Sequence, residues 1–563
     1  MAERVARHHH RLTHRLAHRL RRPVGLLGLA LLPALVLGVF FLLPVSGMVA
    51  RGFWPDGDFA PGDVLEVLGR SRTGRVVWFT VWSAGTATAV AVVLGLPAAY
   101  ALHRLDFPLR RLVRAALLVP FVLPTVVVGV AFRELLGESG PLGFLGFDGT
   151  PVAIVAGLVF FNAAVVIRAV GASWESLDSR PAEAAAALGA TPLQVFRTVT
   201  LPSLRPAIVS AASVVFLFCA TSFGVVLTLG GTRYSSVETE IYLLTTDLLD
   251  LPAAAALSIV QLLAVVTLLA IAARLRASAD PSVTRVPSRP RRPARGDAAQ
   301  LAMTGLLLLL VAAPILTLVL GSLRVGDAWS LGNYRALDST GSQQALVVPV
   351  TEALVTSLRT AVDATWISLT LGLLVALAVT RRSRSRAERR IRTVLDGFFM
   401  LPLGVSAATL GFGFLITLDR PPVDLRDSAL LVPIAQALVA LPLVVRTLVP
   451  VLDGIDDRQR QAAASLGAGP LRTLLTVDVP VLWKPLLAAS GFAFAASLGE
   501  FGATAFLARD ESATLPVVIF RLIGHPGAMN YGMALAASVV LATTTAVVML
   551  AVERLRVPSL GAL

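Results

Sequence analysis

Long apolar runs separated by short polar segments fill this chain of 563 residues. Most runs hold about 20 residues or more, which is the length an α-helix needs to cross a hydrocarbon layer of about 30 Å. Because a helix satisfies its own backbone hydrogen bonds in lipid, each run predicts one membrane-spanning helix. Twelve spans are expected, at residues 25–48, 76–102, 112–136, 152–172, 207–230, 253–273, 301–321, 354–380, 394–418, 429–450, 486–506 and 533–552.

One polar segment between these runs occurs twice. EAAAALGATPLQVFRTVTLP at residues 183–202 and QAAASLGAGPLRTLLTVDVP at residues 461–480 are identical at 11 of 20 positions when they are aligned with an offset of 278. These two segments are termed the repeat loops. Each follows one apolar run and precedes another, so each is expected to be a polar connection between two membrane helices. The duplication indicates that the chain consists of two equivalent halves.

The duplication extends beyond the repeat loops. The tripeptide SFG at 222–224 matches EFG at 500–502 at the same offset. Because matching segments keep the same order and the same side of the membrane, the pattern predicts a parallel repeat of two six-helix domains in an all-α polytopic membrane protein. The expected division is a basic tail at 1–24, a first domain at 25–273, a linker at 274–300, a second domain at 301–552 and a tail at 553–563.

Composition supports the same class. Hydrophobic residues make up 55% of the chain, charged residues make up 15%, and the mean hydropathy is +0.76. These values exclude an ordinary soluble protein, in which about 25% of residues are charged. The linker at 274–300 is rich in arginine and proline, cannot bury a core, and is therefore expected to be flexible.

Basic residues are distributed unevenly between the two sides of the predicted membrane. If the N-terminus is cytoplasmic, 36 of the 49 lysines and arginines fall in cytoplasmic segments and 11 fall in external ones. This bias predicts a multi-pass membrane protein, surrounded by lipid, with both termini, the linker and both repeat loops in the cytoplasm. The net charge of +14 therefore reflects topology, and no nucleic-acid partner is expected.

The sequence lacks the elements of an ATP-hydrolysing enzyme. Lys484 is the only lysine and is followed by Pro485, whereas a phosphate-binding loop needs a lysine followed by serine or threonine. Cys219 is the only cysteine, so no intramolecular disulfide or thiol-based metal site can form. The chain is therefore not expected to be an enzyme or to hold a cofactor or metal, and uphill transport would need a separate ATPase or an ion gradient.

The repeat loops resemble the EAA loop of permease subunits in binding-protein-dependent ABC importers. The resemblance rests on Glu183, the alanines after it, Gly189 and the final Leu-Pro pair, while the second loop has Gln461 and Gly467 at the equivalent positions. It implies that both loops dock a cytoplasmic ABC ATPase dimer. The residues to which this docking role maps are Glu183, Ala184, Ala185, Gly189 and Pro192 in the first loop and Gln461, Ala462, Ala463, Gly467 and Pro470 in the second.

The residue types in the repeat loops suit such a docking role. Alanines are strong helix formers whose small side chains permit close approach, and a glycine ends or bends the helix. Only the first loop carries a charge at its leading position, Glu183, where the second loop has Gln461. Because a charge-assisted hydrogen bond is about twice as strong as a neutral one, we expect the first loop to dock more strongly.

Glu500 is the best candidate for a functional ionisable group inside a predicted span. It lies within the run 486–506 with no basic residue nearby in the sequence, and a charge at that depth is costly. We expect it either to line the translocation path or to gate that path by pairing across the interface between the halves. The alternative is a hydrogen-bonded tie between helices.

The duplicated single-chain form and the segment after Phe223 resemble the thiamine and iron(III) permease group. This resemblance implies the fused membrane subunit of an ABC importer, which forms the path for a small substrate delivered by an extracytoplasmic binding protein. No external segment is long enough to capture the substrate itself, since the longest is 322–353. The alternatives are a secondary transporter with two parallel six-helix halves, which needs ion-binding carboxylates at the membrane midplane, and, third, a membrane enzyme.

Overall fold

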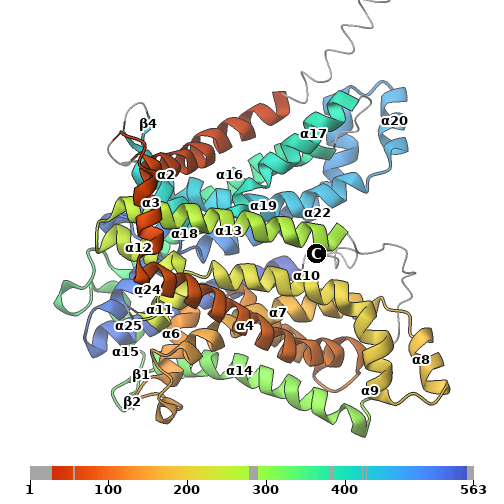
Figure 1. The fold of residues 1–563 in the computed structure, drawn as a ribbon, viewed down its shortest axis with the longest axis horizontal. Coiled ribbons are helices and arrows are strands. Elements are labelled where there is room, and N and C mark those ends of the chain that lie inside the picture. Colours follow the sequence, from red (N-terminus) through yellow and green to blue (C-terminus); the bar gives the residue numbers. More distant parts are fainter. Residues whose placement is uncertain are drawn as a thin grey trace, which may run out of the picture.

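The computed structural model describes residues 28–54, 57–231, 233–277, 290–380, 386–420, 423–425 and 428–554. The predicted tail at 1–24, the greater part of the other tail and the linker residues 278–289 lie outside the described residues. Figure 1 shows a bundle of helices that run roughly parallel to one another. The all-α fold class is confirmed. The described strands form two short antiparallel hairpins, β1 (Arg324–Val325) with β2 (Ala328–Trp329) and β3 (Asp419–Arg420) with β4 (Val423–Asp424).

Ten of the described helices are long and apolar enough to cross a membrane, and they correspond to ten of the twelve predicted spans. The first of them runs continuously from Gly28 to Phe53. The main helical segments of these spans are α2 (Leu43–Phe53), α4 (Ser71–Arg104), α7 (Pro151–Glu175), α10 (Leu201–Ala220), α13 (Leu251–Ala277), α14 (Ala298–Ser322), α16 (Val350–Thr380), α19 (Leu431–Asp453), α22 (Val479–Leu498) and α25 (Ala528–Arg554).

The predictions of single helices at 112–136 and 394–418 are wrong, because both spans are interrupted. Proline has no backbone N–H and its ring clashes with the preceding turn, so it weakens a helix at that point. It does not break every helix, since Pro97 and Pro442 lie inside the continuous helices α4 and α19. Pro124 and Pro402 stand at the two interruptions and are equivalent at the offset of 278. Both halves therefore break at the same point. The resulting segments are α5 (Arg110–Leu118) and α6 (Thr125–Leu136) in the first half and α17 (Arg386–Phe399) and α18 (Ala407–Thr417) in the second.

A second pair of breaks shortens the spans predicted at 207–230 and 486–506. In the first half α10 ends at Ala220 and a separate helix, α11 (Gly224–Gly230), follows it. In the second half α22 ends at Leu498 before the short α23 (Thr504–Leu507). Non-helical backbone at membrane depth is tolerated only where protein surrounds it. Each half thus contains two broken helices, and the break points are equivalent in the repeat.

The helices of each half pack together, but the first helix of each half also crosses to the other half. The helices α4, α7 and α10 pack against one another, as do α16, α19 and α22. In contrast, α2 packs on α18 of the second half, and α14 packs on α4 and α6 of the first half. A buried cluster joins Leu37 and Phe41 to Leu371 and Leu438. The two halves are therefore interlocked and do not form separate packing units.

The two ends of the bundle carry different short elements (Figure 1). One end, termed the repeat-loop end, carries the helices α8 and α20 of the repeat loops. The opposite end carries α3, α12, α15 and α24 together with the β1–β2 hairpin. Their bounds are α3 (Pro61–Gly69), α8 (Arg180–Ala187), α9 (Pro192–Val195), α12 (Val237–Thr246), α15 (Gly332–Arg335), α20 (Asp457–Ser465), α21 (Pro470–Thr473) and α24 (Leu515–Gly524).

The described part of the predicted linker is anchored to the first half. The backbone of Arg291 accepts a hydrogen bond from the Asp106 N–H at 2.7 Å and donates one to the Arg104 carbonyl at 3.0 Å. Its guanidinium binds both oxygens of Asp297 at 2.7 and 2.8 Å, and the Tyr100 hydroxyl donates to the same carboxylate at 3.0 Å. The segment that leads into α14 is thus tied to the end of α4.

Candidate functional site

Each repeat loop folds into a short helix that ends at its glycine. Gly189 has a φ of +86° and Gly467 a φ of +84°, a left-handed conformation that glycine adopts without strain. In the first loop the Ala190 N–H donates to the Ala185 carbonyl at 3.1 Å, and the equivalent bond of 3.0 Å closes α20. This pattern is a Schellman termination. The glycines therefore end both helices, as the sequence predicts.

The tip of each repeat loop exposes one leucine. Leu188 is 90% exposed and Leu466 is 88% exposed, the highest values of any large hydrophobic side chain in the described residues. The two positions are equivalent at the offset of 278. Single exposed hydrophobic residues are common on protein surfaces and carry little information. Two exposed leucines at equivalent positions of a repeat instead indicate a surface that binds another protein. The sequence did not reveal this exposure, because leucine is frequent throughout the chain.

The residues to which docking was assigned lie on these exposed loops. Glu183 is exposed in the first turn of α8, and Gln461 is exposed on α20. Pro192 and Pro470 are the first residues of the next short helices, α9 and α21. The alanines that follow Glu183 and Gln461, at positions 184, 185, 462 and 463, are exposed or half-buried. The structure brings each set together within its own loop, and Figure 1 shows α8 and α20 well apart at the same end of the bundle.

Glu183 also has an electrostatic neighbour within the chain. The guanidinium of Arg104, at the end of α4, lies close enough to the Glu183 carboxylate to attract it. Because the Glu183 side chain is exposed, this attraction is screened by solvent. The carboxylate therefore remains accessible to a partner protein, and its docking role stays a prediction.

A central seam forms where the second pair of helix breaks meets. Phe223 and Phe501 are equivalent in the repeat, and their rings stack with centroids 5.3 Å apart and an angle of 27° between the planes. A Cβ atom added to Gly224 would clash with the Thr125 side chain of its own half and would lie 3.2 Å from the Phe501 ring of the other half. One added to Gly502 would lie 2.9 Å from the Ala407 side chain of its own half. Glycine is needed at both positions for this close approach. The SFG and EFG matches in the sequence therefore mark a contact between the halves.

Three further rings surround the stacked pair. The ring centroids of Phe223 and Tyr242 are 5.4 Å apart, those of Tyr242 and Phe506 are 5.3 Å apart, and those of Phe501 and Phe520 are 5.4 Å apart. These five residues are termed the aromatic seam. They come from both halves, from the breaks themselves and from the helices that follow them.

A cavity of about 260 Å³ adjoins the aromatic seam. Most of its lining comes from α12 and α24, which lie at the end opposite the repeat loops. The one arginine in its lining, Arg521, is paired with Asp510 at 2.8 Å. The cavity therefore presents aromatic rings, and the positive charge of Arg521 beside them is largely neutralised by Asp510. Its lining consists of Tyr242, Phe501, Ala505, Val517, Phe520, Arg521, Gly524 and His525.

Glu500 lies next to the stacked pair and is buried, with 6% of its surface exposed. Its carboxylate oxygens accept the backbone N–H groups of Ala503 at 2.7 Å and Thr504 at 3.1 Å. These bonds satisfy the first donors of α23, as a helix cap does. The described contacts of this carboxylate therefore stabilise the break in the second half with groups of that half alone. A role of Glu500 in the translocation path stays a prediction.

Glu238 is a buried carboxylate that the sequence did not indicate. It accepts hydrogen bonds from the Gln261 amide at 2.9 Å and from the Ser406 hydroxyl of the second half at 2.7 Å, and its exposed fraction is 0%. Ser406 also accepts the Thr409 N–H at 3.0 Å and so caps α18. The sequence places Glu238 in an external loop between two spans, but this segment folds inward as α12. No local pattern signals such a return into the bundle.

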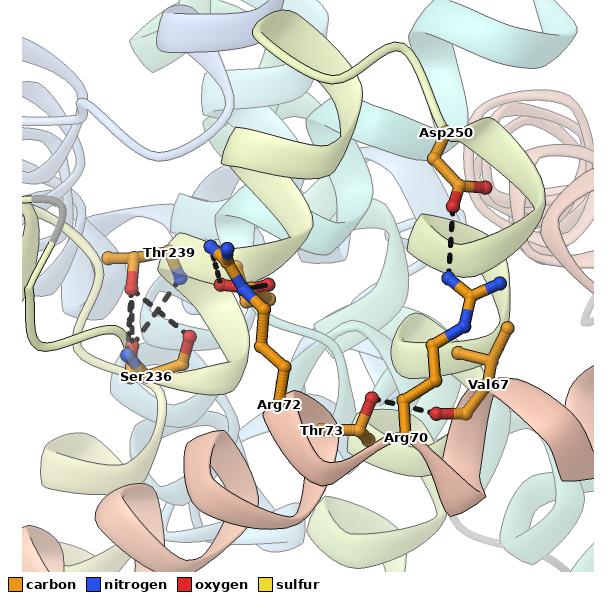
Figure 2. A network of polar contacts seen from close by, with 8 residues as sticks. Val67, Arg70, Arg72, Thr73, Ser236, Thr239 and Asp250 are labelled. Carbon is orange, nitrogen blue, oxygen red and sulfur yellow. Dashed lines mark hydrogen bonds and ion pairs between the residues drawn. The ribbon is translucent and has the colours of Figure 1, made fainter.

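The end opposite the repeat loops is fixed by ion pairs between the start of α4 and the α12 region (Figure 2). The Arg72 guanidinium binds both oxygens of Glu240, at 2.5 and 3.1 Å, and Arg70 binds Asp250 at 3.2 Å. The Ser236 and Thr239 side chains cap the start of α12 beside them. Because a bidentate arginine pair holds a fixed geometry, the Arg72–Glu240 pair positions α12, the helix that contributes Tyr242 to the aromatic seam.

Together these features define a class of protein. The bundle has two halves related by a repeat, broken helices that meet at a central seam, a cavity on one side of the seam, and paired exposed loops at the opposite end. This is the architecture of a membrane permease with a path between its halves. The chain belongs to the family of inner membrane components of binding-protein-dependent transport systems. The model of this family matches residues 91–285 and 368–556.

The chain is similar over most of its length to known transport proteins. It is 28% identical to the thiamine transport system permease protein ThiP of Brucella abortus (strain 2308), over 80% of this chain and 82% of that protein. It is also 28% identical to ThiP of Escherichia coli (strain K12), over 82% and 86%. The ferric transport system permease protein FbpB of Actinobacillus pleuropneumoniae is 24% identical, over 90% of this chain and 75% of that protein.

Proposed function

We propose that this permease works in an importer driven by a separate ABC ATPase dimer, which docks on the two repeat loops. The observation that supports the proposal is the pair of glycine-closed helices at one end of the bundle, each presenting an exposed leucine. A rigid helix with small side chains can enter a groove in a partner protein. It can then transmit the movement of that partner to the membrane helices on either side of the loop. The absence of a phosphate-binding lysine from the sequence agrees with a separate ATPase.

The repeat-loop end is the cytoplasmic end in this proposal, because the arginine-rich segments are expected on that side. The opposite end, with α3, α12, α24 and the β1–β2 hairpin, would then receive an extracytoplasmic binding protein. The localisation that follows is the bacterial plasma membrane, with both termini in the cytoplasm.

Cysteine labelling tests this orientation. The first variant is Ser512→Cys in a Cys219→Ala background, at the end opposite the repeat loops. It should react with an impermeant thiol reagent in intact cells, because Ser512 is exposed. Ala294→Cys, exposed in the linker segment, should react only after the membrane is permeabilised. Labelling of Ala294→Cys in intact cells would contradict the orientation, and the Cys219→Ala background alone serves as the control for nonspecific labelling.

We infer further that the substrate is thiamine or a closely similar cationic molecule with flat heteroaromatic rings. Its path would run from the cavity through the aromatic seam, whose rings can stack on a flat ring and attract a cation through their faces. Glu500, beside the seam, is the candidate ionisable residue of this path. The thiamine permeases similar to this chain support the inference, and the ferric permease makes iron(III) the competing substrate.

Transport by the reconstituted complex tests both parts of the proposal. With its ATPase and binding protein in proteoliposomes, the chain should accumulate labelled thiamine only when hydrolysable ATP is present on the repeat-loop side. Uptake of iron(III) in place of thiamine would overturn the substrate while leaving the importer function intact. Uptake by the chain alone, driven by an ion gradient, would overturn the importer function in favour of a secondary transporter.

A further inference from the structure

The second repeat loop contains an ion-pair cluster around one arginine. The Nε atom of Arg460 lies 2.9 Å from the carboxylate of Asp478, and Nη1 lies 3.3 Å from the carboxylate of Asp457. Nη2 donates to the Leu452 carbonyl at 3.4 Å. Arg460 and Asp478 are largely buried, with side chains 27% and 10% exposed. This pair is therefore shielded from solvent more than an ordinary surface ion pair.

The three partners of Arg460 lie on three different elements. Leu452 is in the last turn of α19, Asp457 begins α20, and Asp478 ends the π-helical segment that leads into α22. One side chain therefore ties the loop helix to both of the membrane helices that flank it. Any displacement of α20 relative to α19 or α22 must stretch these charge-assisted bonds. The loop helix and the two membrane helices are thus held as one unit.

The first repeat loop has no equivalent of this cluster. At the offset of 278 the positions of Arg460 and Asp478 are occupied by Ala182 and Thr200, and the position of Asp457 is occupied by Ser179. Alanine cannot form an ion pair, so α8 is not tied to α7 and α10 by this device. The two loops are alike in backbone and in their exposed leucines, but only the second has this buried cluster joining its helix to the membrane helices on either side.

We propose that the Arg460–Asp478 pair is the device that transmits the movement of a docked ATPase from α20 to the second half, and that the two repeat loops therefore act unequally. This inference rests on the proposed function, because it concerns the same docking surface. The second loop lacks the charged residue that Glu183 supplies to the first. Rigid attachment lets it transmit movement without that contact. Arg460 is a positioning residue, since it acts through the loop helix.

The test compares docking with coupling in the complete complex in proteoliposomes. Arg460→Ala should bind the ATPase as the wild type does, yet lower the transport per ATP hydrolysed about tenfold, because a largely buried charge-assisted contact is lost. Arg458→Ala, on the exposed neighbouring position of the same helix, is the matched control and should couple normally. The charge exchange Arg460→Asp with Asp478→Arg should restore most of the coupling.

The outcomes separate this inference from the proposed function. If the wild-type chain does not bind the ATPase, the proposed function fails. If the wild type couples and Arg460→Ala couples equally well, the inference alone is overturned. Should Arg460→Ala fail to assemble, Arg460→Lys, which keeps one bond to Asp478, should give intermediate coupling. Wild-type coupling by the lysine variant, or no recovery in the charge exchange, would then overturn the inference.

Discussion

The double substitution Leu188→Asp with Leu466→Asp is expected to abolish ATPase docking and, with it, ATP-driven uptake. Both leucines are almost fully exposed, at 90% and 88%, so each can bury its whole side chain in a partner. Full burial of a leucine contributes about 1.5–3 kcal/mol. Loss of both contacts, about 3–6 kcal/mol, corresponds to a fall in affinity of roughly 10²- to 10⁴-fold. Co-purification of the ATPase with the chain measures the effect directly.

The matched control is Leu65→Asp, because Leu65 is 69% exposed on α3 at the opposite end of the bundle. That variant adds the same charge in place of the same side chain and should retain the ATPase. Normal co-purification by the double variant would show that the loop tips are not the docking surface.

Removal of both stacked rings, by Phe223→Ala with Phe501→Ala, is expected to make the permease leak substrate without ATP. Their rings close the seam between the halves at a centroid distance of 5.3 Å. Stacking of this kind contributes about 0.5–1.5 kcal/mol beyond the burial of the rings. Its loss therefore shifts the equilibrium between the closed and the open seam toward the open form by up to about tenfold. The two truncations also widen the gap that the rings had filled. Efflux of labelled thiamine from loaded proteoliposomes, measured without nucleotide, reports the leak.

Phe412→Ala provides the control for general loosening of the core. Phe412 is fully buried on α18, and its ring centroid lies 6.4 Å from that of Phe506, outside the stacked pair. This variant loses a comparable ring but should remain tight. Equal efflux from both variants would show that the leak arises from lost stability and not from an opened seam.

The sequence alone predicted the class of fold and the location of one candidate site. The long apolar runs predicted ten spans correctly. Unpaired backbone groups are costly in lipid, so an apolar run that crosses the membrane almost always forms a helix. The repeated glycines also predicted where both loop helices end, since a positive φ favours glycine strongly. The exposure of Leu188 and Leu466 could not be predicted, because hydropathy does not distinguish a leucine in lipid from one at a loop tip.

The sequence by itself determined what depends on local chemistry: helices in the membrane, two equivalent halves, and polar loops closed by glycine. The tertiary structure decided what depends on partners far away in the chain. It stacked Phe223 on Phe501, joined Glu238 to Ser406 across the halves, and placed α14 against the first half. The breaks at Pro124 and Pro402 belong to this second group. Surrounding protein, and not the apolar character of the run, makes a broken helix tolerable inside the bundle.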